Sequence, residues 1–283
     1  MTHPFGAWQA LVDLALAEDI GAGDITSLAT VPAEASAEGT MLVKQPGVIS
    51  GLSAASYVFE RVDPAISFRP RCEDGTHLDA GEVLADLSGP ARSVLAGERV
   101  ALNLLQRLSG VATLTARYVE AVSGTHATIV DTRKTTPGLR VLEKAAVRHG
   151  GGQNHRFGLS DGVLIKDNHL AAIGGPDRVT RAVQAARRHA PHTTKIEVEV
   201  TTLAETEEAL AAGADIIMLD NMSESEMAGA VRVVAGRALL EASGGVRLET
   251  VRNIAETGVD LISVGALTHS APALDISLNF TIR

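Results

Sequence analysis

The sequence predicts an α/β protein in which a smaller α+β part precedes a parallel α/β barrel. Three observations indicate this fold. Six short apolar runs alternate with amphipathic segments in the second half, the first half mixes one helix with strand-like pieces, and 283 residues suffice for a barrel with a smaller companion. No G-x-G-x-x-G motif follows a first strand, which disfavours a dinucleotide-binding sheet. Six successive units favour a barrel, complete or with a missing or irregular unit, over an open doubly wound sheet.

The first half, up to about residue 90, contains one predicted helix followed by short strands separated by Gly and Pro. Asp13, Glu18 and Asp19 interrupt the apolar residues of this N-terminal helix, so it predicts neither a secretory signal nor a membrane span. The strand-like pieces are 39–43, 47–50 and 81–85. A long amphipathic helix from Ala96 to about Val122 follows and carries Arg99 in its first turn.

The second half consists of strand and helix units whose later members are spaced by roughly 20 residues, as a parallel sheet requires. The predicted strands are 128–131, 162–165, 195–200, 216–219, 238–241 and 261–264. The predicted helices are 177–190, 203–212, 224–234 and 248–257. Gly258 ends the last of them.

Charge and cysteine content restrict the partners and the compartment. The formal net charge is -9 at pH 7, with 34 acidic and 25 basic side chains, which argues against a nucleic-acid partner. Cys72 is the only cysteine, so no intrachain disulfide can form and a reducing, cytoplasmic setting is expected. We expect a soluble protein without a membrane partner.

Polar residues and glycines follow the predicted strands at their C-terminal ends, where barrel enzymes carry their chemistry. A glycine-rich loop between the first two strands, 150–156, adds His155 and Arg156. The residues at the strand ends are Thr132, Arg133 and Lys134; Lys166; Glu199, two positions after Glu197; Asp220 with Asn221; Ser243, Gly244 and Gly245; and Gly265 with Ala266. Together they predict a single mouth with a basic, an acidic and a glycine-lined side.

Each side of this mouth suits a different ligand group. The arginines and lysines of the basic side suit carboxylates. Glu199 and Asp220 suit a hydrated Mg²⁺, which prefers one or two carboxylates together with water and substrate oxygens. The backbone N–H groups of the glycine-lined side suit a phosphate, which barrels commonly hold after their last two strands.

Ordinary structural roles are open for the same residues. The Arg133–Lys134 pair is compatible with a solvated turn, and His155 with a hydrogen-bonded loop histidine. Asp220–Asn221 is compatible with a cap for the helix that begins near Ser223, and Gly244–Gly245 with a tight turn.

Two of the strand-end residues leave further alternatives open. Lys166 is compatible with an exposed strand terminus or with a Schiff-base nucleophile. Of Glu197 and Glu199, we expect one to face the barrel interior and the other the helices. The joint occurrence of all these residues at one end of successive strands favours a common site.

Long ordered stretches resemble the quinolinate phosphoribosyltransferase family, the decarboxylating nicotinate-nucleotide pyrophosphorylases of NAD biosynthesis, over nearly the whole chain. The stretches are EDIGAGDITS at 18–27, GERVALNLLQRLSGVAT at 97–113, DTRKTTPGLR at 131–140, KAAVRHGGGQNHRFGLSDGVLIKDNH at 144–169, EVEV at 197–200, MLDN at 218–221, EASGG at 241–245 and SVGALTHS at 263–270.

The resemblance implies an architecture and an assembly. It implies an N-terminal α/β sandwich domain over 1–108, joined by the C-terminal segment 273–283, and a catalytic α/β barrel over 109–272 with fewer than eight regular strands. It also implies a homodimer with shared active sites, in which Arg99 reaches into the neighbouring subunit. A hexamer built as a trimer of dimers is an alternative assembly.

The resemblance also implies roles for single residues. Arg99, Arg133, His155, Arg156 and Lys166 match quinolinate-binding positions, with Thr132 beside them. The positions implied for the phosphoribosyl donor and its Mg²⁺ are Lys134, Glu199, Asp220, Ser243, Gly244, Gly245, Val264, Gly265 and Ala266, with His269 nearby. Lys134, Lys166, Glu199 and Asp220 are the implied catalytic residues.

The implied reaction transfers the phosphoribosyl group of 5-phosphoribosyl-1-pyrophosphate to quinolinate and removes one carboxylate as CO₂, giving nicotinate mononucleotide and pyrophosphate. The alternatives are a phosphoribosyltransferase for a related pyridine carboxylate such as nicotinate, a Schiff-base lyase that uses Lys166, and a ligand-binding relative without catalysis. The number of basic residues exceeds what one carboxylate requires, which disfavours nicotinate.

Overall fold

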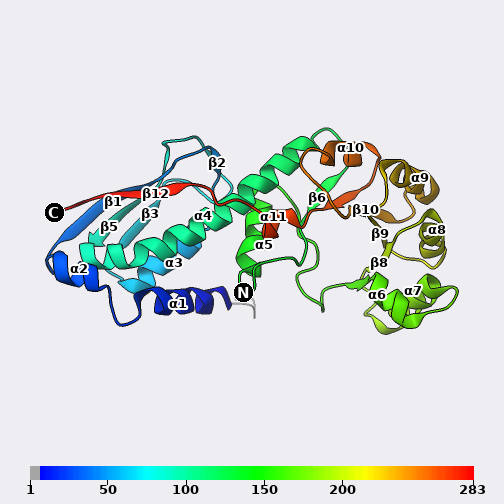
Figure 1. Cartoon of the computed structure of the whole chain (residues 1–283), viewed down its shortest axis with the longest axis horizontal. Helices are drawn as coiled ribbons and strands as arrows, with labels where there is room; N and C mark the ends of the chain where they lie inside the picture. Colours follow the sequence, from blue (N-terminus) through cyan, green and yellow to red (C-terminus); the bar gives the residue numbers. More distant parts are fainter. Residues whose placement is uncertain (1–6) are drawn as a thin grey trace. The chain divides into compact units, whose positions relative to one another are not determined.

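The computed structural model describes residues 7–283, which form two compact units (Figure 1). The first unit contains 7–116, 135–151 and 267–283, and the second contains 117–134 and 152–266. The boundary falls inside helix α4 (Ala91–Ala121), and the segment 135–151 belongs to the first unit. The first six positions of the domain expected over 1–108 lie outside the described residues.

The first unit is built on a four-stranded antiparallel sheet with the order β12-β1-β5-β3. Its strands are β1 (Ser36–Val43), β3 (Ser67–Pro70), β5 (Val83–Pro90) and β12 (Ile276–Ile282). Strand β12 comes from the C-terminal end of the chain and pairs with β1 (Figure 1). The separate N-terminal sheet predicted from the resemblance is therefore present.

Helices cover one face of this sheet. Met41, Leu84 and Ile276 of the strands pack with Phe59 and Leu105 of the helices in one apolar core, as the alternation of a half-buried sheet requires. The helices of the first unit are α1 (Ala7–Ile20), α2 (Ile25–Thr30), α3 (Leu52–Val62), α5 (Arg140–His149) and most of α4, and two short strands, β2 (Gly47–Val48) and β4 (His77–Leu78), pair beside them. The prediction of one helix before residue 90 was incomplete, because α2 and α3 also form.

The second unit is a six-stranded parallel sheet with the order β6-β11-β10-β9-β8-β7, and it confirms the predicted parallel fold. The strands are β6 (Thr128–Val130), β7 (Val163–Ile165), β8 (Ile196–Val200), β9 (Ile216–Asp220), β10 (Leu239–Ser243) and β11 (Leu261–Ser263). Residues from all six strands line one interior cavity of about 230 Å³, so the sheet curves around a common axis as a barrel. Fewer than eight strands take part in it.

The helices of the second unit follow its strands. They are α6 (Asp167–Ile173), α7 (Arg178–His189), α8 (Leu203–Ala211), α9 (Glu224–Val234) and α10 (Val251–Glu256). Helix α11 (Ala266–His269) begins at the last residue of this unit and continues into the first. Ser223 caps α9 in a capping box with Glu226, so the suggestion that Asp220–Asn221 caps this helix was wrong. None of the helices within 7–283 combines the length and the apolar character that crossing a membrane requires.

Candidate functional site

A cavity of about 570 Å³ opens where the barrel strands end. Most residues predicted at the strand ends line it. They are Thr132, Arg133, Lys134, His155, Arg156, Lys166, Glu199, Asp220, Ser243, Gly244 and Gly245. The cavity walls also include Asn221, named with Asp220 at its strand end, and Met218, Glu241 and Ser263, which the prediction did not assign. The structure therefore brings the predicted basic, acidic and glycine residues together in the wall of one cavity.

The period of two along each strand explains which residues reach the cavity. Successive side chains of a strand point to opposite faces, so residues two apart share a face. Glu197 and Glu199 on β8 both face the barrel interior, and Met218 and Asp220 on β9 do the same. The expectation that Glu197 and Glu199 face opposite sides was wrong, because positions i and i+2 of a strand always point the same way.

The basic side brings two guanidinium groups together. Burial lowers the pKa of Arg156 from its ordinary value, and the positive charge of Arg133 lowers it further. Arg156 donates from Nη1 to the carbonyl of Gly162 at 3.2 Å, while its buried Nε has no hydrogen-bond partner. Partly buried cations that repel one another favour the binding of an anion between them.

The glycine-rich loop that carries His155 and Arg156 is attached to the end of β6 by Asp131. Its fully buried carboxylate accepts the side-chain amide of Asn154 at 2.7 Å and the backbone N–H of His155 at 2.8 Å. The backbone of Asp131 also donates to Gln153. Sequence reasoning missed this role, since Asp131 was named only as the end of a predicted strand and within the resembling stretch.

The acidic side consists of Glu199 and Asp220 on neighbouring strands. Burial raises the pKa of Glu199, the adjacent Lys166 ammonium opposes this, and the charge of Asp220 raises it again. Lys166 Nζ lies 3.7 Å from Glu199 Oε2, and its side chain is 48% exposed. A carboxylate whose charge is disfavoured by a neighbouring carboxylate gains from a cation that both can bind, so this donor set fits Mg²⁺.

The glycine-lined side is a tight turn after β10. Gly244 has a φ of 94°, and a Cβ at this position would lie 2.9 Å from the backbone nitrogen of Asn221. Asn221 itself donates its N–H to the carbonyl of Ser243. Gly244 is therefore required by the close approach of two strand ends, whatever the turn binds.

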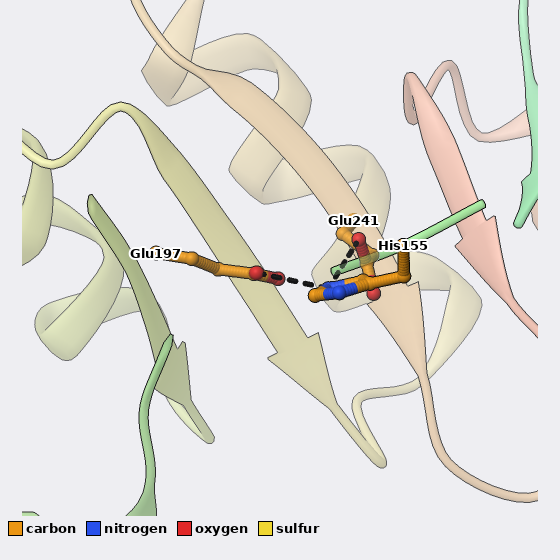
Figure 2. Close-up of side chains that lie close together, drawn as sticks. All are labelled: His155, Glu197 and Glu241. Carbon is orange, nitrogen blue, oxygen red and sulfur yellow. Dashed lines mark ion pairs between the residues drawn. The ribbon is translucent and has the colours of Figure 1, made fainter. Parts of the chain in front are cut away.

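Beneath the rim, His155 lies between two buried carboxylates (Figure 2). Its Nε2 is 3.0 Å from Glu197 Oε2 and 3.7 Å from Glu241 Oε2. Burial raises the pKa of Glu241 to about 7, and the neighbouring charge of Glu197 acts in the same direction. The second oxygen of each carboxylate, Oε1, is buried without a hydrogen-bond partner. We call these three side chains the buried cluster.

The buried cluster has metal-ligand chemistry, since its three candidate ligand atoms lie within 4.8 Å of one another. However, the 3.0 Å contact between His155 Nε2 and Glu197 Oε2 has the length of a hydrogen bond, and burial favours the protonated form of Glu241 by raising its pKa to about 7. Hydrogen bonding within the cluster therefore accounts for its arrangement. Glu241 could have been found by counting back two positions from Ser243 on the same strand.

Several predicted residues do not line the cavity. Val264 is buried and donates to the carbonyl of Val130, and Gly265 and Ala266 are absent from the walls. Arg99, exposed on α4, and His269 belong to the first unit. Their binding roles stay predictions.

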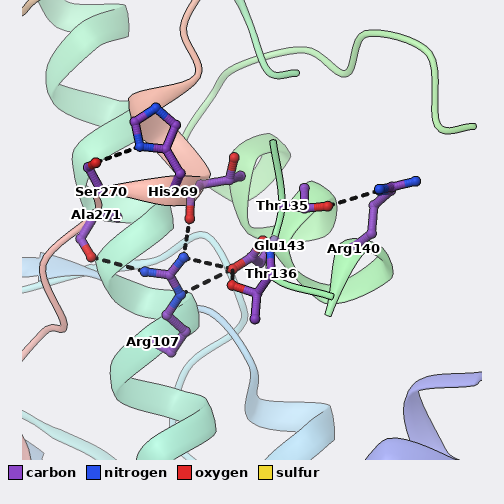
Figure 3. Close-up of polar contacts among 9 residues, drawn as sticks. Arg107, Thr135, Thr136, Arg140, Glu143, His269, Ser270 and Ala271 are labelled. Carbon is purple, nitrogen blue, oxygen red and sulfur yellow. Dashed lines mark hydrogen bonds and ion pairs between the residues drawn. The ribbon is translucent and has the colours of Figure 1, made fainter. Parts of the chain in front are cut away.

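The surroundings of His269 are structural within the first unit (Figure 3). Arg107 of α4 donates to the fully buried Glu143 of α5 at 2.8 Å and to the carbonyls of Thr268 and Ala271. Glu143 also accepts the N–H of Thr136. This network fixes the backbone around His269, whose ring contacts the hydroxyl of Ser270.

The raised pKa of Glu241 predicts a pH-dependent stability. The folded chain keeps this proton up to about pH 7, whereas the unfolded chain loses it near the ordinary value of 4.5, so stability falls as pH rises through this window. The slope from one such group is at most about 1.4 kcal/mol per pH unit. Glu241→Gln cannot ionise, so its urea-unfolding free energy should fall less than that of the wild type between about pH 5 and 7. The exposed Glu256→Gln is the matched control, and parallel curves for wild type and Glu241→Gln would contradict the assignment.

Comparisons with known proteins agree with this geometry. The model of the quinolinate phosphoribosyl transferase C-terminal domain matches residues 111–279, and that of the N-terminal domain matches 24–109. A probable nicotinate-nucleotide pyrophosphorylase (carboxylating) of Bacillus subtilis is 46% identical over 94% of this chain and 90% of its own. The nicotinate-nucleotide pyrophosphorylase (carboxylating) of Mycobacterium leprae is 46% identical over 97% and 98% of the two chains.

A solved structure shows the same fold. The crystal structure of NadC from Streptococcus pyogenes matches with a TM-score of 0.93 and 42% identity, over 100% of this chain and 99% of that one. Family models cover both halves, and relatives above 40% identity cover nearly the full length. The chain belongs to the quinolinate phosphoribosyltransferase family.

Proposed function

We propose that this chain catalyses the reaction of its family in NAD biosynthesis. The ring nitrogen of quinolinate attacks the anomeric carbon of 5-phosphoribosyl-1-pyrophosphate, pyrophosphate leaves, and the 2-carboxylate is lost as CO₂ to give nicotinate mononucleotide. The observation that carries the substrate choice is the pair of adjacent guanidinium groups, Arg133 and Arg156, in the barrel mouth.

A dicarboxylate suits this basic side better than a monocarboxylate. Quinolinate has carboxylates on adjacent ring carbons, and each arginine offers a planar donor pair to one carboxylate. Binding of two negative charges would offset the repulsion that lowers the pKa of Arg156. Holding the ring this way also directs its nitrogen toward the anomeric carbon of the donor. Such positioning can lower the activation free energy by several kcal/mol, up to about 7–11 kcal/mol in well-oriented cases.

Lys166 is the candidate group for the decarboxylation step. When the bond from C2 to the carboxylate breaks, the electron pair stays on C2 beside the cationic ring nitrogen, and C2 then takes a proton. Lys166 lines the cavity and its ammonium group lies close to Glu199, so it can supply positive charge or that proton. With a side chain 48% exposed, it lacks the burial that a Schiff-base nucleophile requires, which disfavours the lyase alternative.

Glu199 and Asp220 are the residues that would hold Mg²⁺. When bound, the ion supplies positive charge that stabilises the departing pyrophosphate oxygens. Lys134 is exposed at the same rim and adds a further positive charge for the donor phosphates. The N–H groups around Gly244 and Gly245 offer hydrogen bonds to those phosphates.

The first test is a turnover assay of the purified protein with quinolinate, 5-phosphoribosyl-1-pyrophosphate and Mg²⁺. We expect CO₂ and nicotinate mononucleotide in equal amounts, with turnover abolished by a chelator and restored by added Mg²⁺. Nicotinate is the matched control substrate, since it lacks the second carboxylate. Binding of quinolinate without turnover would favour a non-catalytic relative, and turnover of nicotinate would contradict the dicarboxylate site.

The division of the mouth into sides predicts a selective defect in Arg133→Ala. Quinolinate affinity should fall about 10- to 100-fold, because hydrogen bonds to charged groups contribute roughly 1.5–3 kcal/mol. Affinity for the phosphoribosyl donor should stay close to that of the wild type. Isothermal titration calorimetry with each ligand measures both. Arg178→Ala, which removes an arginine paired with Glu205 on the surface, is the control, and an equal loss for both ligands would refute the division.

We also infer a homodimer with shared active sites, in which Arg99 of one subunit serves the cavity of the other, and we expect it in the cytoplasm. An exposed Arg99 on a unit separate from the cavity supports this. In a heterodimer of one Arg99→Ala and one Arg133→Ala subunit, one cavity has both arginines and the other has neither. Each heterodimer should therefore show up to about half of the activity of the wild-type dimer. Purified heterodimers with no more activity than either variant alone would argue against shared sites, and fractionation of cells tests the compartment.

A further inference from the structure

The two ring nitrogens of His155 have different partners. Its Nδ1 accepts the backbone N–H of Arg156 at 2.7 Å, so this nitrogen carries no proton. The ring proton therefore lies on Nε2, which points at Glu197 Oε2, 3.0 Å away. This assignment follows from the hydrogen bonds on both sides of the ring.

A histidine bound in this way has no N–H left for a ligand in the mouth. Both ring nitrogens of His155 are used by the protein itself: Nδ1 by the backbone N–H of Arg156 and Nε2 by Glu197. The resemblance implied a quinolinate-binding role for His155. The hydrogen bonds favour an indirect role, because the group held by its Nδ1 is the backbone of Arg156, a residue of the basic side.

The groups that face Glu241 determine whether its carboxyl group is charged. They are Glu197 on β8, His155 in the loop, Ser263 on β11 and Asp131 at the end of β6. His155 and Ser263 stabilise the carboxylate form of Glu241, while Glu197, Asp131 and above all burial disfavour it. One proton shared within the cluster leaves Glu197 free to accept from His155 and relieves the repulsion between the two carboxyl groups.

We propose that Glu197 and Glu241 are positioning residues that act through His155, fixing its ring so that Nδ1 holds the backbone of Arg156 and directs that guanidinium to the substrate carboxylate. The proposal rests on the proposed function. Asp131 accepts the backbone N–H of His155, and His155 Nδ1 accepts the backbone N–H of Arg156. The loop is therefore held at two successive backbone N–H groups. Loss of either carboxylate should therefore weaken quinolinate binding without touching the donor side.

A double-mutant cycle tests whether Glu197 acts through His155. Steady-state kinetics for quinolinate and for the phosphoribosyl donor are measured on wild type, Glu197→Ala, His155→Ala and the double variant. Each single variant should raise KM for quinolinate about 10-fold and leave KM for the donor within about twofold, and the double variant should be no worse than His155→Ala, because coupled residues are not additive. Multiplied effects, or equal rises for both substrates, would overturn the proposal.

Conservative variants separate positioning from folding. Glu197→Gln keeps an oxygen that can accept from His155 and should recover part of the lost affinity. Glu241→Gln resembles the protonated carboxyl and should lose less quinolinate affinity than Glu241→Ala. Above this pH the wild-type KM for quinolinate should rise as Glu241 loses its proton, whereas Glu241→Gln should show a smaller rise. Glu256→Gln, which changes an exposed carboxylate paired with Arg252 on α10, is the control and should leave both KM values unchanged.

The same experiments keep the two proposals apart. Wild-type protein without turnover would refute the proposed function. In that case quinolinate affinities of the same variants, measured by calorimetry, decide the inference: equal affinities in wild type and Glu197→Ala would overturn it, and a fall of about 10-fold that is not additive with His155→Ala would support it.

Discussion

The site depends on one geometric constraint: the strands of the second unit are parallel, so all their carboxyl ends meet at one rim, and every second side chain faces the interior. This constraint produces two layers. The rim layer contains charged side chains such as Lys166, Glu199 and Asp220, and the layer below contains Glu197 and Glu241. The register of neighbouring strands places interior residues beside one another, as with Glu199 opposite Met218 and Ser243 opposite Asp220.

The rim layer holds like charges close together on each of its sides. Arg133 lowers the pKa of Arg156, and Asp220 raises that of Glu199, so each side carries an electrostatic cost before any ligand binds. Local rules of stability are often violated in this way at functional sites. A ligand with carboxylates for one side and a cation-bound pyrophosphate for the other would relieve both costs. The charge pattern therefore favours the simultaneous presence of two differently charged ligand groups over a single neutral one.

Sequence patterns predicted the six strands, the helices α4 and α7 to α10 and most of the rim residues, because apolar runs and the residues that follow them are local signals. They failed where the outcome depends on tertiary contacts. Asp131 and Glu241 stand inside strand patterns, and only the folded barrel shows that they hold the loop and His155. Gly244 was predicted to belong to a phosphate-binding turn or a plain tight turn, and its close approach to Asn221 at the end of a neighbouring strand could not be read from the sequence. The opposite faces assigned to Glu197 and Glu199 were an error in applying the strand period, which the sequence alone could have corrected.

The buried cluster would be unnecessary if stability were its only role. Two carboxyl groups with unpartnered oxygens inside a barrel are costly, and well-packed apolar side chains in such places are often as stable or more stable. An apolar residue at position 197 could not accept the Nε2 proton of His155, and a ring without that partner could turn and release the backbone N–H of Arg156. The free-energy cost of burying these carboxyl groups is therefore best explained by their role in orienting the ring of His155. A carboxylate in the lower layer fixes a histidine, the histidine fixes the loop backbone, and the loop presents an arginine at the rim, so the two layers of the barrel act on one substrate contact.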